Sequence, residues 1–268
     1  MPELPEVETV IRTLEHQIKD AEIEKVQVIY PKLVDNLDPR EFENKLKGQH
    51  FRKFERRGKY LIFELDDYIL VSHLRMEGKF YVEPDLKVKD KHTHLIISLT
   101  DSRFIMYHDV RKFGRMQLYP KGTELTVLNK LGLEPFDQNL NIDYLKKKCP
   151  AHHELKEILL DQSIIAGIGN IYANEICFAM KVLPDKQFFQ LSDKQLQALI
   201  DSTRTILAAA IKDGGTTIRS YTSSLGVNGK FQQHLMVHGQ QICKVCGSQI
   251  KKVYLKGRGT YYCPKCQK

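Results

Sequence analysis

The first residues of the chain place apolar side chains at the spacing of one helical face. These positions are Val7, Val10, Ile11, Leu14 and Ile18. Pro5 suits the first helical turn, where its missing N–H has no partner to lose, and Glu6 and Glu8 complement the positive end of the helix dipole. The pattern predicts an amphipathic helix at the N-terminus.

Residues 22–120 follow a different pattern, in which short β-rich segments alternate with turn residues. The expected strands are Ile23–Tyr30, Phe51–Arg57, Tyr60–Leu65, Tyr68–Leu74, His94–Leu99 and Arg103–Tyr107. The one expected helical interruption is Arg40–Leu46, closed by Gly48. Short strands joined by regular turns predict a β-sandwich or barrel.

The pattern changes again between Leu128 and Pro150, where glycine and prolines punctuate polar sequence. Helical spacing then returns around residues 155–159, 171–179 and 191–211, and Gly214-Gly215 stops the last helix. Residues 214–230, rich in Gly, Ser and Thr, are expected to form a mobile loop. The expected organisation is α+β: a helix plus β-sandwich domain over residues 1–130, a linker over 131–150, a helical domain over 151–230 and a cysteine module over 231–268.

Composition narrows the class of protein. The chain has 268 residues, 42% of them hydrophobic and without a long apolar run, so we expect a soluble protein with no membrane segment. It opens without the basic and apolar regions of a signal peptide, which favours the cytoplasm. A net charge of +8 and a pI near 9.0 suit a polyanionic partner, although charge alone does not exclude a merely basic protein.

Four of the six cysteines have the spacing of a zinc site. Cys243-x2-Cys246-x16-Cys263-x2-Cys266 is a two-knuckle pattern, and four thiolates leave no open position for a catalytic water, so the predicted zinc is single and structural. A hairpin, Gln249–Lys256 and Thr260–Tyr262, is expected between the pairs, turning at Gly257-Arg258-Gly259. Two disulfides in an exported domain are the alternative. Cys149 and Cys177 fall outside the spacing and are expected to be buried.

Pro2 and Glu3 need an explanation beyond a plain helix. If Met1 is removed, Pro2 offers a secondary amine beside a carboxylate. An α-amino group has a pKa near 7.7–8.0, so roughly a tenth of it is neutral and nucleophilic at pH 7. Its reaction with an aldehyde-like carbon gives a cationic iminium, which is a good electron sink.

Several further residues have two interpretations on the sequence alone. Residues 166–172 (AGIGNIY) lack the preceding strand and third glycine of a dinucleotide loop, but they suit a tight turn ending at Asn170 as helix N-cap, with free N–H groups toward a phosphate. An ordinary interhelical turn is the alternative. His92 and His94 are expected on one face of a strand, as a metal pair without an evident third ligand or as separate contacts.

Large side chains also stand where strands end. Met76 lies in SHLRMEGKF, and Arg111 and Phe113 lie in DVRKFG. Such residues are more often part of a core. An enzyme that flips a base out of a duplex, however, needs side chains to fill the gap.

The motifs MPELPEVETV, RRGKYL, SHLRMEGKF, DVRKFG, AGIGNIYANE and GRGTYYCPKC occur in the order found in bacterial formamidopyrimidine-DNA glycosylase. The chain closely resembles this family over essentially its whole length. The resemblance implies a β-sandwich domain, a helix-two-turn-helix domain and a zinc-ribbon hairpin. It also implies a bifunctional glycosylase and lyase that acts, as a monomer, on duplex DNA containing an oxidised purine opposite cytosine.

The resemblance assigns roles residue by residue. It implies a catalytic group of Pro2 as nucleophile, Glu3 as proton donor, Lys59 in the pocket and Arg258 at the phosphates around the lesion. It implies DNA contacts by His92, Lys156 and Asn170, a wedge of Met76 and Phe113, and recognition of the opposite cytosine by Arg111. Glu6 shapes the pocket or holds a water, and the loop at 214–230 closes over the base. Ala151-His152-His153 and Glu157 depart from the family pattern, which predicts a weaker phosphate contact there.

Three alternatives remain at this stage. Endonuclease VIII, which prefers oxidised pyrimidines, is disfavoured by Leu4 and by the Arg111/Phe113 pair. A non-enzymatic zinc-ribbon DNA-binding protein is disfavoured because it has no need of Pro2, Glu3 and Lys59 together. A member that holds lesions without cutting them is not excluded.

Overall fold

The computed structural model describes residues 1–216 and 229–268. The chain divides into two compact units, which we treat separately. Unit 1 is Met1–Val127 with the described ends of Gly214–Gly229, and unit 2 is Leu128–Asp213 with Lys230–Lys268.

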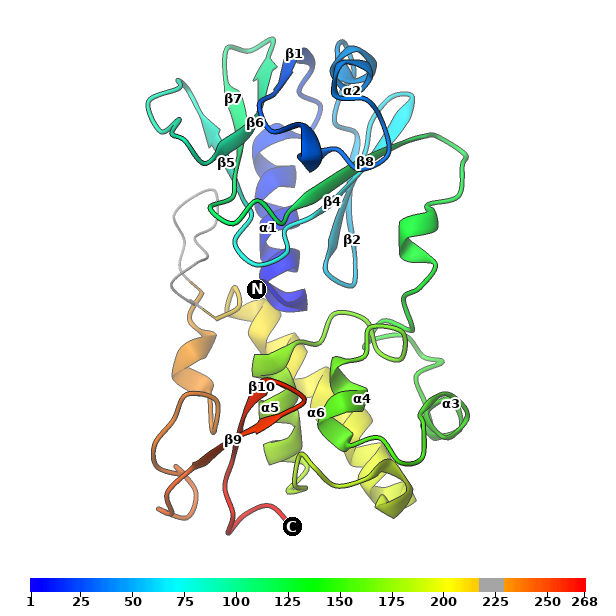
Figure 1. The fold of residues 1–268 in the computed structure, drawn as a ribbon, viewed down its shortest axis with the longest axis vertical. Helices are drawn as coiled ribbons and strands as arrows, with labels where there is room; N and C mark the ends of the chain where they lie inside the picture. Colours follow the sequence, from blue (N-terminus) through cyan, green and yellow to red (C-terminus); the bar gives the residue numbers. More distant parts are fainter. Residues whose placement is uncertain (217–228) are drawn as a thin grey trace. The chain divides into compact units, whose positions relative to one another are not determined.

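Unit 1 is built around the N-terminal helix α1 (Leu4–Ile18). The helix contacts two four-stranded antiparallel sheets, with strand orders β1-β6-β7-β5 and β2-β3-β4-β8 (Figure 1). The strands are β1 (Ile23–Val28), β2 (Lys53–Arg57), β3 (Tyr60–Glu64), β4 (Tyr68–His73), β5 (Lys79–Glu83), β6 (Thr93–Leu99), β7 (Phe104–His108) and β8 (Arg115–Pro120). The apolar face of α1 and both sheets share one core. The predicted helix and β-sandwich are thus confirmed.

The predicted helical interruption is also confirmed. Helix α2 (Pro39–Leu46) begins after Asp38, whose carboxylate accepts the N–H groups of Arg40 and Glu41. Its buried side chains, Phe42 and Leu46, belong to the same core. The helix therefore completes the sandwich rather than forming a separate element.

Unit 2 is mainly helical. Its helices are α3 (Ile142–Lys148), α4 (Leu155–Leu160), α5 (Asn170–Ala179) and α6 (Asp193–Lys212), and β9 (Lys251–Leu255) pairs with β10 (Arg258–Tyr262). Helix α5 packs against α4, α6 and β10. Helix α3 lies inside the stretch that we expected to be a linker, and the side chain of Asn141 caps it by accepting the N–H of Tyr144.

Short 3-10 turns complete the two units. They are η1 (Pro31–Leu33), η2 (Thr126–Leu128), η3 (Phe188–Gln190) and η4 (Phe231–His234). No helix among the described residues is long and apolar enough to span a membrane.

Candidate active site and metal centre

Buried ionisable groups gather at the N-terminus of α1. Glu3, the N-cap residue, and Glu6 are each only 3% exposed, and Glu6 accepts the N–H of Glu3 at 2.9 Å within a capping box. The second Glu6 oxygen accepts the N–H and the hydroxyl of Thr216, at 2.7 and 3.0 Å. Pro2 is buried beside them. Glu6 thus fixes the helix entrance and ties residue 216 to it.

The chain's terminal amine shares this environment. Burial lowers the pKa of the Met1 amino group, while the nearby Glu3 and Glu6 carboxylates oppose that shift and Lys59 adds to it. A lower pKa raises the fraction of neutral, nucleophilic amine at pH 7. Removal of Met1 transfers the terminal amine to Pro2, one residue nearer the helix.

Lys59 lies in the turn between β2 and β3 and is only 6% exposed. A salt bridge holds this hairpin against α1: Arg56 Nε donates to Glu8 at 2.7 Å, and Arg56 Nη1 donates to the carbonyl of Gly58 at 2.9 Å. Lys59 is therefore not a solvent-exposed strand lysine. Lys59 lies close enough to the Met1 amine to lower its pKa.

His73 is a buried ionisable residue that the sequence reasoning did not single out. Burial lowers the pKa of its imidazole to about 3, and Arg75 and Lys59 add to the shift. Its Nδ1 accepts the N–H of Arg75 at 2.9 Å, so in the neutral ring Nε2 carries the proton. His73 is the second residue of the SHLRMEGKF motif, but nothing in that motif separates it from an ordinary strand histidine.

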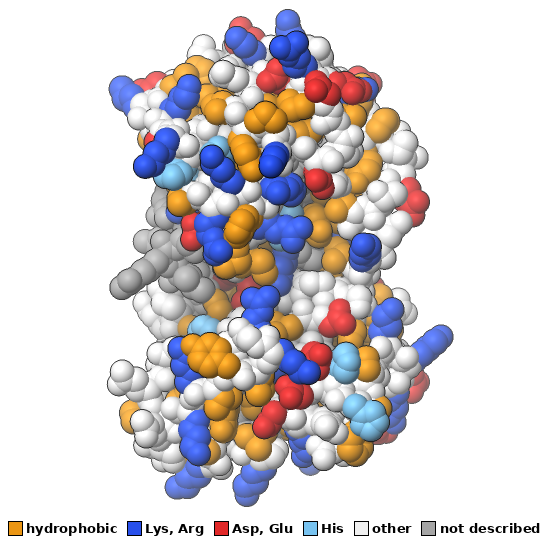
Figure 2. Space-filling view, viewed as in Figure 1, with side chains coloured by type: hydrophobic (Ala, Val, Ile, Leu, Met, Phe, Trp, Pro, Cys, Tyr) orange, Lys and Arg blue, Asp and Glu red, His pale blue; other side chains and the backbone are white. Residues whose placement is uncertain are grey.

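Met76, Arg111 and Phe113 lie on two turns of unit 1. Met76 is half-buried in the turn between β4 and β5. Phe113, before β8, is 47% exposed, so it is not a core residue, and the Arg111 guanidinium lies 4.7 Å from its ring centroid. Over unit 1, Figure 2 shows Lys and Arg side chains with apolar ones among them. Such a surface suits a nucleic acid.

His92 and His94 separate in the structure. His94 is buried in β6 and its Nε2 lies 2.8 Å from the carbonyl of Asp109, to which it donates. His92 precedes the strand, is partly exposed and contacts the ring of His108. Across the described residues, the cysteine group is the only cluster of three or more possible metal ligands. The two histidines therefore make separate contacts in the structure.

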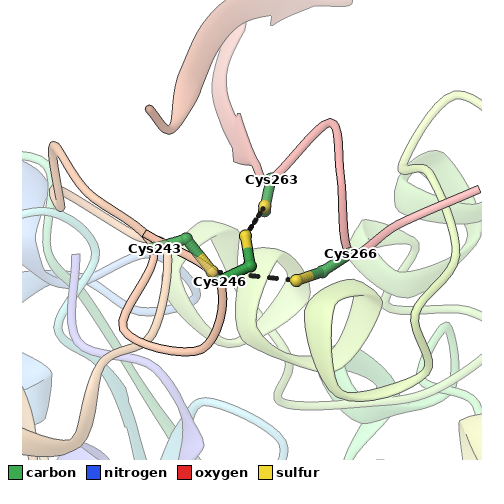
Figure 3. Close-up of side chains that lie close together, drawn as sticks. All are labelled: Cys243, Cys246, Cys263 and Cys266. Atoms are coloured by element: carbon green, nitrogen blue, oxygen red, sulfur yellow. Dashed lines mark hydrogen bonds between the residues drawn. The ribbon is translucent and has the colours of Figure 1, made fainter. Parts of the chain in front are cut away.

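The cysteine module brings four sulfur atoms together at one end of the β9–β10 hairpin (Figure 3). All lie within 4.8 Å of one another, with Cys243 and Cys266 at 3.9 Å and Cys246 and Cys263 at 3.5 Å. A zinc ion about 2.3 Å from each sulfur in a tetrahedron needs sulfur separations of about 3.8 Å. A disulfide needs about 2 Å, so the four thiols fit one structural zinc and the disulfide alternative is wrong.

The other two cysteines are buried, as predicted. Cys149 is 8% exposed and Cys177 is fully buried, and burial raises the pKa of each thiol to about 12. Both are therefore protonated and unreactive at neutral pH.

The hairpin that follows the zinc knuckle presents Arg258 to solvent. Arg258 opens β10 rather than occupying the turn, which is made by Lys256 and Gly257, both with positive φ. Lys156 on α4 is 1% exposed, and its ammonium donates to the carbonyl of Gly259 at 3.0 Å and to the Thr260 hydroxyl at 2.7 Å. The cation that the family pattern assigns to DNA thus supports the arginine-bearing strand.

Asn170 contacts the same strand. We expected it to be the N-cap of its helix, but Gly169 is the N-cap and Asn170 is the first residue of α5. Its amide nitrogen donates to the Gly259 carbonyl at 3.0 Å instead of capping the helix. The expected closing loop at 214–230 falls for the most part outside the described residues.

The sequence is similar to known proteins along its whole length. Models of three domains match it: the formamidopyrimidine-DNA glycosylase N-terminal domain over residues 1–116, the H2TH domain of the same enzyme over 131–222 and the zinc finger found in FPG and IleRS over 241–268. A formamidopyrimidine-DNA glycosylase of Bacillus cereus is 43% identical over 273 residues, covering 100% of this chain and 99% of its own. One from Listeria monocytogenes is 42% identical over 274 residues, covering 100% of both.

Solved structures agree with these matches. The Lactococcus lactis Fpg bound to DNA with an abasic site has a TM-score of 0.91 and 40% identity, covering 99% of each chain. The same enzyme bound to DNA with an N7-benzyl-Fapy-dG gives equal values. The chain therefore belongs to the formamidopyrimidine-DNA glycosylase family of base-excision-repair enzymes, which are DNA glycosylases and AP lyases.

Proposed function

We propose that this enzyme excises oxidised purines, 8-oxoguanine and formamidopyrimidines, from duplex DNA in which they lie opposite cytosine. The observation that carries the proposal is the buried group of Pro2, Glu3 and Lys59 at the N-terminus of α1. A binding protein gains nothing from burying an amine between two carboxylates and a lysine, because each charge loses its hydration. The Lactococcus neighbours, which hold abasic and Fapy-containing DNA, support DNA as the partner, as does the net charge of +8.

The reaction begins at the amine of Pro2 after loss of Met1. Its lone pair attacks C1′ of a flipped nucleotide, and the base departs with the electrons of the glycosidic bond. The nitrogen then gives up its proton and its lone pair forms a C=N bond to C1′. The C1′–O4′ bond breaks, and Glu3 gives a proton to O4′. The result is a ring-opened iminium bound to Pro2.

The iminium draws electrons from the adjacent C–H bond. Removal of a proton from C2′ expels the 3′ phosphate, and removal of one from C4′ expels the 5′ phosphate, which leaves a one-nucleotide gap. Lys59 lies in the pocket where these protons move. Arg258 holds the phosphates and assists the second elimination. When bound, zinc stabilises the hairpin through Cys243, Cys246, Cys263 and Cys266 and takes no chemical step.

The remaining contacts serve recognition. His92, Asn170 and Arg258 face the backbone phosphates, with Lys156 supporting the last of these through its hydrogen bonds to β10. Met76 and Phe113 fill the vacated stack, and Arg111 pairs with the orphaned cytosine. We infer a monomer that works in the bacterial cytoplasm.

Borohydride trapping tests the proposal. The probe is a duplex with 8-oxoguanine opposite cytosine, compared with an undamaged duplex and with one carrying an oxidised pyrimidine, because a Lactococcus Fpg structure also holds such a lesion. A covalent adduct formed fastest with 8-oxoguanine supports the enzyme, its substrate class and its amine nucleophile. Faster trapping of the pyrimidine would favour the endonuclease VIII type of activity. Binding of the lesion with no adduct would identify a member that holds lesions without cutting.

A further inference from the structure

One carboxylate fixes the turn that carries Arg111 and Phe113. Asp109 follows β7 and is 0% exposed. Its Oδ1 accepts the N–H of Arg111 at 3.0 Å, and its Oδ2 accepts the N–H groups of Phe113 at 2.9 Å and of Gly114 at 2.8 Å. The buried charge is thus balanced by three backbone donors of a single turn.

The backbone of Asp109 anchors this turn to its neighbours. Its N–H donates to the carbonyl of His92 at 2.9 Å, and its carbonyl accepts Nε2 of His94 at 2.8 Å. The turn also contains Lys112 at a φ of 58°, in the left-handed region that side chains disfavour. Since that conformation costs energy, the hydrogen bonds to Asp109 are what maintain it.

A second residue sets the distance between this turn and the one that carries Met76. Tyr107 on β7 is 1% exposed, and its hydroxyl lies where two glycines approach it closely. A Cβ atom on Gly78 would stand 2.1 Å from that hydroxyl, and one on Gly114 would stand 1.7 Å from it. Gly78 and Gly114 close the two turns, so the tyrosine ring acts as a spacer between them.

We propose that Asp109 is a positioning residue that holds Arg111 and Phe113 in their DNA-reading geometry before DNA is bound. The inference rests on the proposed function of these two side chains. Arg111 and Phe113 are both exposed, and neither is ordered by the core. A preformed turn spares the enzyme the entropy of ordering the backbone that carries these two side chains during base flipping. Asp109 contributes no atom to the reaction.

Asp109→Asn is the test, because the amide keeps the shape of the carboxylate. An amide has one acceptor oxygen, and its NH2 group must then face at least one N–H of the turn. The matched control is Asp101→Asn. Asp101 Oδ1 likewise accepts a backbone N–H, that of Arg103 at 3.1 Å, in the exposed turn between β6 and β7.

Three rates separate positioning from general damage. We expect Asp109→Asn to lower excision of 8-oxoguanine opposite cytosine at least tenfold and to reduce the preference for cytosine over adenine. Cleavage of a single-stranded oligonucleotide with a ready abasic site should stay within about twofold of wild type, because it has neither a stack nor an opposite base. Asp101→Asn should change none of the three rates. An Asp109→Asn protein with the wild-type preference and rate, or with an equal loss on the single strand, would overturn the proposal.

Amide exchange in the unmodified enzyme provides a test that needs no variant. Without DNA, the N–H groups of Phe113 and Gly114 should exchange far more slowly than that of Val110, an exposed residue of the same turn. Exchange of all three at the rate of an open loop would contradict a preformed turn. If wild-type enzyme fails to excise 8-oxoguanine, the proposed function is wrong. If it succeeds while Asp109→Asn is unaffected, only the role of Asp109 is wrong.

Discussion

The two units bury charged side chains in different ways. In unit 2, each buried charge is bound to the backbone of its own unit: Lys156 donates to the β10 strand, and Glu175 accepts the N–H groups of Met236, Val237 and His238 at 2.7, 3.1 and 2.7 Å. In unit 1, Asp109 is held in the same way, but Glu3, Glu6 and Lys59 surround the chain's terminal amine. A buried charge costs several kcal/mol unless it is paired, so each group must have a purpose.

Buried charges therefore have two different roles in this protein. The buried charges of unit 2 connect segments that are far apart in the chain, since Lys156 and Thr260 are 104 residues apart. Glu3, Glu6 and Lys59 of unit 1 instead lie around the terminal amine, whose pKa they affect. Changes in unit 1 should therefore stop the chemistry of a folded protein, whereas changes in unit 2 should loosen the hairpin while the chemistry persists.

Blocking the N-terminal amine should have the largest effect. A preparation that retains Met1 should give no borohydride-trapped adduct, because Pro2 then has no amine. Pro2→Gly should retain weak trapping through a primary amine. Mass spectrometry of the intact protein and of the adduct measures both. Full trapping by the Met1-blocked protein would show that another amine is the nucleophile.

Loss of the zinc site should have the second-largest effect. Wild type should contain one zinc per chain, and Cys263→Ser should lose both metal and lesion affinity, since structural zinc sites contribute about 10–16 kcal/mol of binding free energy. Metal content by atomic absorption and lesion binding by gel shift are the measurements. Cys149→Ser, at a buried cysteine outside the cluster, is the control and should keep its zinc. A metal-free protein that binds lesions as tightly as wild type would contradict the assignment.

Glu3→Gln should lower base excision about 10²- to 10⁴-fold while lesion binding is retained, because an amide cannot deliver the proton. Cleavage of a duplex that already contains an abasic site should fall less, since no base has to leave. The measurement is the ratio of the two rates. Equal losses on both substrates would make Glu3 a helix cap and nothing more, a role that its place in the capping box also permits.

Local signals account for the parts that the sequence predicted. Short β-rich segments bounded by turn residues predicted most strands of the sandwich, and helical spacing predicted α1 and α6. The paired cysteines predicted the metal site, because the ligands of each knuckle lie three residues apart. Helix α3 was missed although Asn141 is a good N-cap, since the glycine and prolines around it suggested a linker. Strands β5 and β8 were not delimited.

Contacts between distant segments account for what the sequence did not predict. Asp109 is an ordinary turn aspartate until the fold encloses it, and Tyr107 is one more β-strand aromatic until Gly78 and Gly114 approach its hydroxyl. The environment of Lys156 also depends on contacts between distant segments. The family resemblance implies a DNA contact for Lys156, but its burial and its partners depend on a hairpin about a hundred residues further along the chain.

Lys156→Met should have the smallest effect. It distinguishes a lysine that binds a DNA phosphate from one that supports strand β10. The change removes two hydrogen bonds from a charged donor, while Asn170 still donates to Gly259. Thr260 in turn donates to the carbonyl of Arg258 at 2.9 Å, so the loss of these hydrogen bonds should also make the position of Arg258 less well defined. We expect unfolding to become easier by roughly 1–3 kcal/mol. The first elimination should proceed, and its product should accumulate because the second is slower.

Lys146→Met supplies the comparison within the same unit. Lys146 pairs with Asp193 at 2.7 Å but is 49% exposed, and an exposed pair contributes about 0–1 kcal/mol, so its loss should change little. Thermal unfolding and a gel that separates the two elimination products are the measurements. The contrary outcome has two parts. Lys156→Met would melt like wild type, and the slope of log K for DNA binding against log salt concentration would become smaller in magnitude by about 0.9. That loss corresponds to one phosphate contact, so Lys156 would bind the DNA backbone directly and the hairpin would hold without it.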